Sequence, residues 1–371
     1  MNLFSSLIFS DSYSGQSNEL STNRTLASIP FAGRFRLVDF TLSALVNAGV
    51  SNVAVITKSN YASLQDHLGD GKYWDLNHRN SGLRLLSPFF RSETNNEAFM
   101  ARGKLDALRS VQKYIASIKE EYVVLSNANV VANVDFDSAF DQHISSGADI
   151  TCIYANLPSD SQSMLKLELD GTSVKAMTYA QVENKTVSAS LNIYLMKRDL
   201  LLDIIREADA HDHYIFEKYA LINNVGKLDI RAFEHKDYAR IIKNVNDYYQ
   251  ASVDMLDADI RAEVFKSDSP VMTRVKDSVP ALYHFNANIE NSLIADGCHI
   301  DGTVKNSIIF RNVTIETGAV VENSIIMQNS VIGKNSTLNC VILDKDVTVS
   351  ENKILCGAAE YPYVFKKSTK I

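Results

Sequence analysis

The stretch "ENSLIADGCHIDGTVKNSII" (Glu290–Ile309) decides the fold of the C-terminal part of the chain. Its opening phrase returns as "KNSII", "ENSII" and "LNCVI", which places asparagines at 291, 306, 323 and 339, spaced 15, 17 and 16 residues apart. Apolar residues recur at six-residue steps, from 294 to 300, from 309 to 315, and from 326 through 332 to 338. Such steps, grouped about three to a turn, are typical of a left-handed parallel β-helix, in which aliphatic side chains stack from coil to coil. An antiparallel β-sandwich would require alternation and hairpin turns, which this segment lacks.

The chain before this repeat alternates strand-like and helix-like segments. Short β-branched or apolar runs predict buried strands at 52–57, 122–126, 149–154 and 188–196. Helical stretches lie between them, and Gly49 closes one at a plausible C-cap position. This alternation predicts a mainly parallel sheet with helices on both faces and ligands at the carboxyl ends of its strands. We therefore expect an α/β domain over 1–245, a helical linker over 246–280 and the β-helix over 281–371.

The composition indicates a globular protein and argues against membrane-spanning and nucleic-acid-binding classes. The 371 residues include 46% hydrophobic and 22% charged residues, as in globular proteins, and no apolar run reaches the roughly 20 residues needed to span a membrane. The net charge of −7 argues against a nucleic-acid partner. The four cysteines are widely spaced, which favours free thiols over a zinc site or disulfides, and no signal peptide is recognisable. We expect a cytoplasmic protein that contacts neither nucleic acid nor membrane.

The stretch "LIFSDSYSGQSNEL" (Leu7–Leu20) stands where an α/β nucleotide enzyme keeps its phosphate-binding loop. Such a loop needs glycines, so that backbone N–H groups can close on phosphate, and a cation. Here Gly15 is the only glycine, Asp11 adds negative charge, and the first Lys or Arg is Arg24. The loop is therefore poorly suited to a triphosphate.

The order of motifs along nearly the whole chain resembles the bacterial ADP-glucose pyrophosphorylase family, which makes ADP-glucose from ATP and glucose 1-phosphate. The motifs that carry the resemblance are "IPFAGRFRLVDFTLSALVNAGV" (29–50), "VITKSNYASLQDHL" (55–68), "RGKLDAL" (102–108), "SASLNIYLM" (188–196) and "NSLIADGCHIDGTVKNSIIF" (291–310). The resemblance implies a Rossmann-like, GT-A-type nucleotidyltransferase domain followed by the β-helix.

At the catalytic positions this chain departs from the family pattern. The family's catalytic arginine falls on Gln16 and its lysine on Leu26. The two aspartates that hold Mg²⁺ fall on Ala128, or on Asn129 if the alignment slips by one, and on Ile241. A neutral glutamine supplies no cation for phosphoryl charge, and alanine and isoleucine supply no hard oxygen ligand. The resemblance thus predicts no intact catalytic residue, no metal site and no cofactor on this chain.

Other family positions are retained. Gly33, Arg34 and Arg36 match an effector-proximal segment, and two arginines at i and i+2 of an extended segment would form a fork for a phosphate. Pairing of these arginines with carboxylates such as Asp39 is the alternative. A second set matches nucleotide- or sugar-proximal positions, as vestigial ligand-binding residues: Gly103, Asp106 and Ser190.

This pattern is similar to that of the D-type, non-catalytic regulatory subunits of the family. That resemblance implies a heterotetramer with a catalytic subunit, on which Mg²⁺ and ATP bind, and leaves open a homo-oligomer when the chain is alone. The main alternative is a divergent, low-activity sugar-1-phosphate nucleotidyltransferase. An acyltransferase, the other use of such a β-helix, would need a catalytic histidine such as His299 and a site for coenzyme A.

Overall fold

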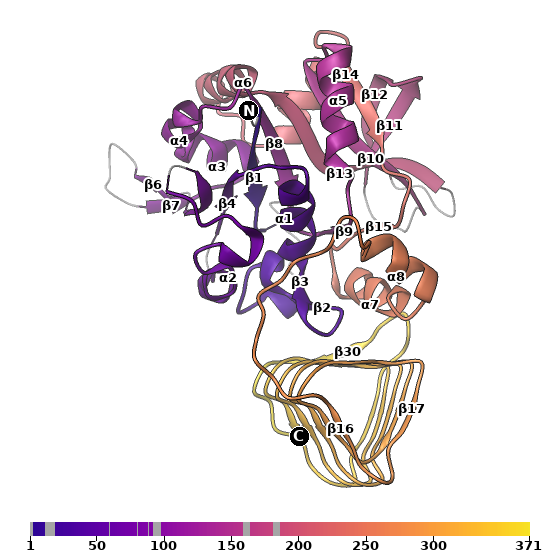
Figure 1. The fold of residues 1–371 in the computed structure, drawn as a ribbon. Helices are drawn as coiled ribbons and strands as arrows, with labels where there is room; N and C mark the ends of the chain where they lie inside the picture. Colours follow the sequence, from indigo (N-terminus) through magenta and orange to yellow (C-terminus); the bar gives the residue numbers. More distant parts are fainter. Residues whose placement is uncertain are drawn as a thin grey trace.

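The computed structural model describes residues 3–11, 19–58, 60–79, 81–87, 89–91, 98–158, 164–180 and 186–371. An N-terminal α/β domain stands above a triangular β-prism, and a pair of helices lies where the two meet (Figure 1). Within the described residues, no helix is long and apolar enough to cross a membrane.

The N-terminal domain is built on one nine-stranded sheet. Its strands are β1 (Phe4–Phe9), β4 (Asn52–Ile56), β5 (Gly82–Leu86), β8 (Tyr122–Asn127), β10 (Ile150–Pro158), β11 (Met164–Asp170), β12 (Ser173–Ala180), β13 (Thr186–Lys197) and β14 (Ile230–Glu234). They follow the order β10-β14-β12-β11-β13-β8-β1-β4-β5. Strands β8, β1, β4 and β5 run parallel, as predicted, but β13 runs antiparallel to β8. The sheet is therefore mixed, because apolar composition identifies a buried strand without fixing its direction.

Helices cover both faces of this sheet. They are α1 (Leu37–Asn47), α2 (Ala62–Leu68), α3 (Lys104–Ser110), α4 (Gln112–Ser117), α5 (Phe136–Ser146) and α6 (Arg198–Ala210). Residues of α1, α2 and α5 share one apolar core with the sheet, and residues of α3, α4 and α6 share another. Gly49 has a φ of 76°, so it ends the α1 segment in the left-handed conformation expected of a C-terminal glycine.

Short elements complete the domain. The strands are β2 (Pro30–Phe31), β3 (Phe35–Arg36), β6 (Phe89–Arg91), β7 (Ala98–Met100), β9 (Val130–Ala132) and β15 (Ala239–Ile241). The single turns of helix are η1 (Glu19–Ser21), η2 (Leu26–Ser28), η3 (Lys72–Trp74), η4 (Glu217–Leu221) and η5 (Ile222–Asn224).

The segment between the two domains contains two helices, α7 (Val245–Asp254) and α8 (Ala258–Val264), instead of one continuous helix. Asp257 accepts hydrogen bonds from the first backbone N–H groups of α8 and so starts a new helix. Residues 265–281 form no helix, so the linker predicted over 246–280 is helical only in its first half.

Helix α7 holds the two domains together. The Tyr248 hydroxyl donates to the carbonyl of Pro30 in the N-terminal domain at 2.7 Å, and the Tyr249 hydroxyl donates to the carbonyl of Asn323 in the β-helix at 2.7 Å. Both tyrosines lie in an apolar core that also contains Phe31 and Ile325. The two domains therefore share a core.

The C-terminal domain is a left-handed β-helix made of three five-stranded parallel sheets. The first sheet is β16 (Leu282–Tyr283), β19 (His299–Ile300), β22 (Thr314–Ile315), β25 (Val331–Ile332) and β28 (Thr348–Val349). The second is β17 (Asn288–Glu290), β20 (Thr303–Lys305), β23 (Val320–Glu322), β26 (Thr337–Asn339) and β29 (Ile354–Cys356). The third is β18 (Leu293–Ile294), β21 (Ile308–Ile309), β24 (Ile325–Ile326), β27 (Val341–Leu343) and β30 (Tyr363–Phe365).

The repeat is in register except at its fourth phrase. Asn291, Asn306 and Asn323 turn a corner with φ between 42° and 47°, a conformation that asparagine tolerates better than most residues. Asn339, however, pairs with Glu322, so that Cys340 occupies the corner with a φ of 52°. The last two corner residues, Asn323 and Cys340, are thus one residue further apart than the asparagines at 323 and 339.

Candidate functional site

Asp11, the last described residue at the start of the opening loop, is held by hydrogen bonds within the N-terminal domain. Asp11 accepts hydrogen bonds from the Leu26 backbone N–H and from the Ser10 hydroxyl, both at 2.9 Å. Burial raises the pKa of the Asp11 carboxyl, although these hydrogen bonds oppose the shift. Leu26, which stands at the family's lysine position, is 5% exposed in an apolar cluster. Gln16 lies outside the described residues.

The two predicted metal-aspartate positions come together in space. Ala128 and Ile241 are 1% and 6% exposed and belong to the same apolar cluster, because β15 and β9 pair with Ile241 opposite Val130. Asn129, the alternative position, uses its amide to donate to the Ile242 carbonyl at 2.8 Å. Across the described ranges, no three His, Cys, Asp or Glu residues are grouped as metal ligands.

Near the carboxyl end of β1 lies a group that we name the carboxyl-end cluster, consisting of Phe9, Lys104, Ser190, Tyr194 and Glu217. Lys104, at the start of α3, forms an ion pair with Glu217, at the start of η4, and both are buried. The Lys104 ammonium lies 5.5 Å from the ring centroid of Phe9 and 6.0 Å from that of Tyr194. Burial and the negative charge of Glu217 hold the pKa of Tyr194 well above its usual value.

Sequence reasoning did not identify this ion pair. Its partners are 113 residues apart. The one available signal was Lys104 within "RGKLDAL", where the resembled motif "RGTADAV" has threonine.

The predicted vestigial residues are bound within the protein. The Ser190 hydroxyl donates to the Tyr194 hydroxyl at 3.3 Å and accepts from the Cys152 thiol at 3.2 Å. Asp106 forms an ion pair with Arg102 at 2.8 Å. A Cβ atom at Gly103 would lie 2.1 Å from the Tyr214 carbonyl oxygen, so this position requires glycine. Ser190 and Asp106 therefore have internal partners, and Gly103 allows the close approach of the Tyr214 backbone.

The two retained arginines diverge. Arg34 lies exposed in the turn between β2 and β3, with its guanidinium 5.3 Å from the Phe35 ring centroid. Arg36 is buried and donates to the backbone carbonyl and the hydroxyl of Ser63 at 2.6 and 3.0 Å. The fork predicted from their spacing does not form, because residues 32–34 make a turn. Ala32 and Gly33 have positive φ angles there, so Arg34 does not lie in an extended strand with Arg36. The alternative pairing is only partly present, since Asp39 accepts from the Arg36 backbone N–H at 2.9 Å.

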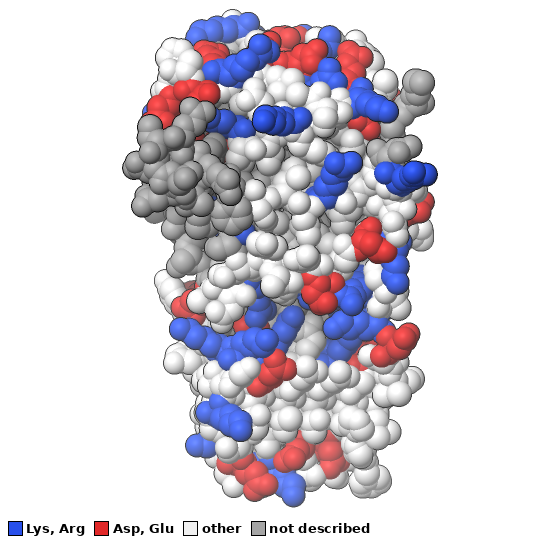
Figure 2. Space-filling view, turned by 90° about the vertical axis from the view of Figure 1, so that its left-hand side faces the viewer, with Lys and Arg blue, Asp and Glu red and all other residues white. Residues whose placement is uncertain are grey.

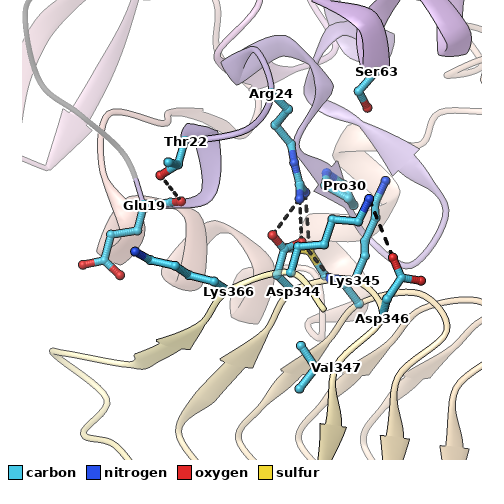
Figure 3. A network of polar contacts seen from close by, with 12 residues as sticks. Glu19, Thr22, Arg24, Pro30, Ser63, Asp344, Lys345, Asp346, Val347 and Lys366 are labelled. Carbon is cyan, nitrogen blue, oxygen red and sulfur yellow. Dashed lines mark hydrogen bonds and ion pairs between the residues drawn. The ribbon is translucent and has the colours of Figure 1, made fainter. Parts of the chain in front are cut away.

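Positive charge gathers instead where the two domains meet. We name Arg24, Arg36, Asp344 and Lys345 the interdomain joint. Arg24 donates to both carboxylate oxygens of Asp344 at 2.7 and 2.6 Å, across 320 residues of sequence. Figure 3 shows Arg24 reaching down from the N-terminal domain onto Asp344 of the β-helix, with Lys345 beside them. On the molecular surface, Lys and Arg side chains form a band at the level between the domains (Figure 2).

The electrostatics of the joint favour an anion. Burial, followed by the charges of Arg36 and Arg24, lowers the pKa of Lys345 to about 7, and Lys276 adds to this effect while Asp344 opposes it. Burial also lowers the pKa of Arg36 to about 10. A bound anion would relieve the repulsion among these cations.

Comparison with known proteins places the chain in a family. Residues 18–164 match the nucleotidyl transferase profile, and residues 280–360 match the GlmU-like, C-terminal hexapeptide profile. A glucose-1-phosphate adenylyltransferase of Geobacillus stearothermophilus is 26% identical over 81% of this chain and 78% of its own length.

Two further relatives are more similar. The glycogen biosynthesis protein GlgD of Bacillus subtilis (strain 168) is 35% identical over 96% of this chain and 93% of its own length. Its namesake from Geobacillus stearothermophilus is 36% identical over 93% of this chain and 91% of its own length. These matches confirm the resemblance, and the chain belongs to the GlgD family of glycogen biosynthesis proteins.

Proposed function

We propose that this chain is a regulatory, catalytically silent subunit of ADP-glucose pyrophosphorylase that acts in glycogen biosynthesis in the cytoplasm. The observation that carries the proposal is the apolar environment of Ala128 and Ile241. Two aspartates at these positions would hold Mg²⁺ in an active relative of this kind, whereas alanine and isoleucine offer no hard oxygen ligand. Mg²⁺ and ATP would bind on a catalytic partner, and this chain would carry no cofactor.

A silent subunit must act through contacts that differ between the two states of its partner. We place this chain in a heterotetramer with the catalytic subunit. The interdomain joint supports a regulatory role, because it gathers cations where two domains share a core and offers a site for an anionic effector. Binding there would bias the relative position of the two domains and hence the surface offered to the partner.

The test is formation of ADP-glucose and pyrophosphate from ATP, Mg²⁺ and glucose 1-phosphate. The purified chain is assayed alone, the catalytic subunit alone, and the two mixed at the same concentrations. We expect no turnover from this chain and a faster or more readily activated catalytic subunit in the mixture. Turnover by the chain alone would instead establish the divergent nucleotidyltransferase, and an unchanged catalytic subunit would reject the regulatory role.

A further inference from the structure

The ion pair between Lys104 and Glu217 lies at the sheet edge where folds of this class bind their ligands. Phe9, the last residue of β1, contributes one of the two rings beside the ammonium. The side chains of Lys104 and Glu217 are 7% and 10% exposed, so the pair is buried with a small residual exposure. None of the chemistry proposed above uses it.

We propose that Lys104 is a masked phosphate-binding residue and that Glu217 keeps its site closed by serving as an internal counter-ion. A lysine ammonium is a compact point charge suited to a phosphomonoester. In this chain the Glu217 carboxylate takes the position that an external anion would otherwise occupy. The inference is independent of the regulatory role, since it concerns only what this domain binds.

Among the groups around Lys104, the Glu217 carboxylate is the one that an external anion could replace. The Ser190 hydroxyl is held by Tyr194 and Cys152, and Tyr194 can also donate to the Asn192 side chain at 3.3 Å. Aromatic rings beside the ammonium stabilise a cation but cannot neutralise it. If the carboxylate is removed, the buried ammonium lacks a counter-ion and gains most from a new anion.

The position of Glu217 suggests how the site could open. Glu217 begins η4, a π-helical turn, and such turns are frequent at functional sites. Tyr214 and Ile215, three and two residues before Glu217, are each 38% exposed although they are large and apolar. A contact on this segment that shifts η4 would withdraw Glu217 from Lys104.

The experiment measures binding of inorganic phosphate to the full chain by calorimetric titration at low ionic strength. Glu217→Gln keeps the shape of the side chain and removes its charge, and we expect it to bind phosphate at least about tenfold more tightly than the unmodified chain, as expected for a charge-assisted contact. Glu121→Gln makes the same charge change at a surface glutamate 4.0 Å from Lys197 and should leave binding unchanged. The double variant Lys104→Gln/Glu217→Gln should lose the gain.

This design separates Lys104 from the interdomain joint. The joint is intact in every variant, so phosphate bound there contributes equally, and the difference between Glu217→Gln and the double variant belongs to Lys104. Equal binding by the unmodified chain and Glu217→Gln would overturn the proposal. If Glu217→Gln does not fold, Glu217→Asp withdraws the carboxylate while keeping its charge. It should then bind phosphate more tightly than the unmodified chain, and no gain would likewise overturn the proposal.

Discussion

The carboxyl-end cluster and the interdomain joint treat charge in opposite ways. In the cluster, Lys104 has its own carboxylate, and the nearby Ser190 hydroxyl is held by internal hydrogen bonds. At the joint, Arg36, Arg24 and Lys276 all disfavour the charged form of Lys345, while Asp344 supplies the opposing charge. The buried cation at the carboxyl end of the sheet therefore has an internal counter-ion, whereas Lys345 between the domains lies among more positive than negative charges.

The largest effect is expected from breaking the joint. Arg24→Ala leaves Asp344 buried without its bidentate partner, and the side chains of the two are 4% and 8% exposed. Removing one partner of a buried pair typically costs about 3–5 kcal/mol. We expect a loss of about 3 kcal/mol in the free energy of unfolding, measured by urea denaturation.

The matched control is Arg206→Ala, because the Arg206–Asp203 pair is about two-thirds exposed at both side chains. An exposed pair contributes about 0–1 kcal/mol. If the two variants lost equal stability, the joint would be no more than another surface contact.

The second prediction introduces carboxylates at the two apolar positions, 128 and 241. Ala128→Asp and Ile241→Asp each bury a carboxylate in an apolar cluster, and each should cost about 2–4 kcal/mol without metal. In the double variant, Mg²⁺ should recover part of that loss, because two carboxylates then share one site. Thermal unfolding with and without Mg²⁺ measures this, with Leu26→Asp as a buried-charge control. Equal Mg²⁺ effects in the single and double variants would contradict a shared site.

Local sequence patterns predicted the parts of the fold that local patterns control. The six-residue period placed Ile300, Ile315 and Ile332 in the β-helix core, because stacking depends on spacing alone. The same repeat failed at Cys340, because Asn339 resembles a corner residue in sequence and only strand pairing reveals the one-residue shift.

The candidate site was less predictable, because its contacts join distant segments. The resemblance supplies an alignment, and from it the family's metal-ligand positions could be assigned to Ala128 and Ile241. The ion pair between Arg24 and Asp344, by contrast, links residues 320 positions apart in two domains. A local sequence pattern cannot predict such a pair. The fork of Arg34 and Arg36 was wrong because the backbone turns between β2 and β3, which a spacing of two residues cannot show.

The third prediction asks whether the joint binds an anion through the buried arginine. Arg36→Lys keeps the charge but removes the planar donor group that reaches Ser63, whereas Arg34→Lys makes the same change at an exposed position two residues away. For a sugar bisphosphate at low ionic strength, we expect about tenfold weaker binding in the first variant and little change in the second. Equal losses would place the anion on the outer surface instead of in the joint.

The smallest expected effect is on the pH dependence of stability, through the lowered pKa of Lys345. The pKa of Lys345 falls from 10.5 to about 7 on folding, so the unfolded chain binds more protons than the folded chain between these values. The contribution of Lys345 to stability is therefore expected to rise as pH increases from about 7 toward 10, and it has no pH dependence below about 7. Lys345→Met should flatten that rise, while Lys353→Met, on an exposed position of the same domain, should leave it unchanged. A bound anion would raise the Lys345 pKa again and flatten the rise in the same way. Urea midpoints measured across this pH range with and without phosphate therefore test whether the joint binds an anion. Identical pH profiles would mean that it does not.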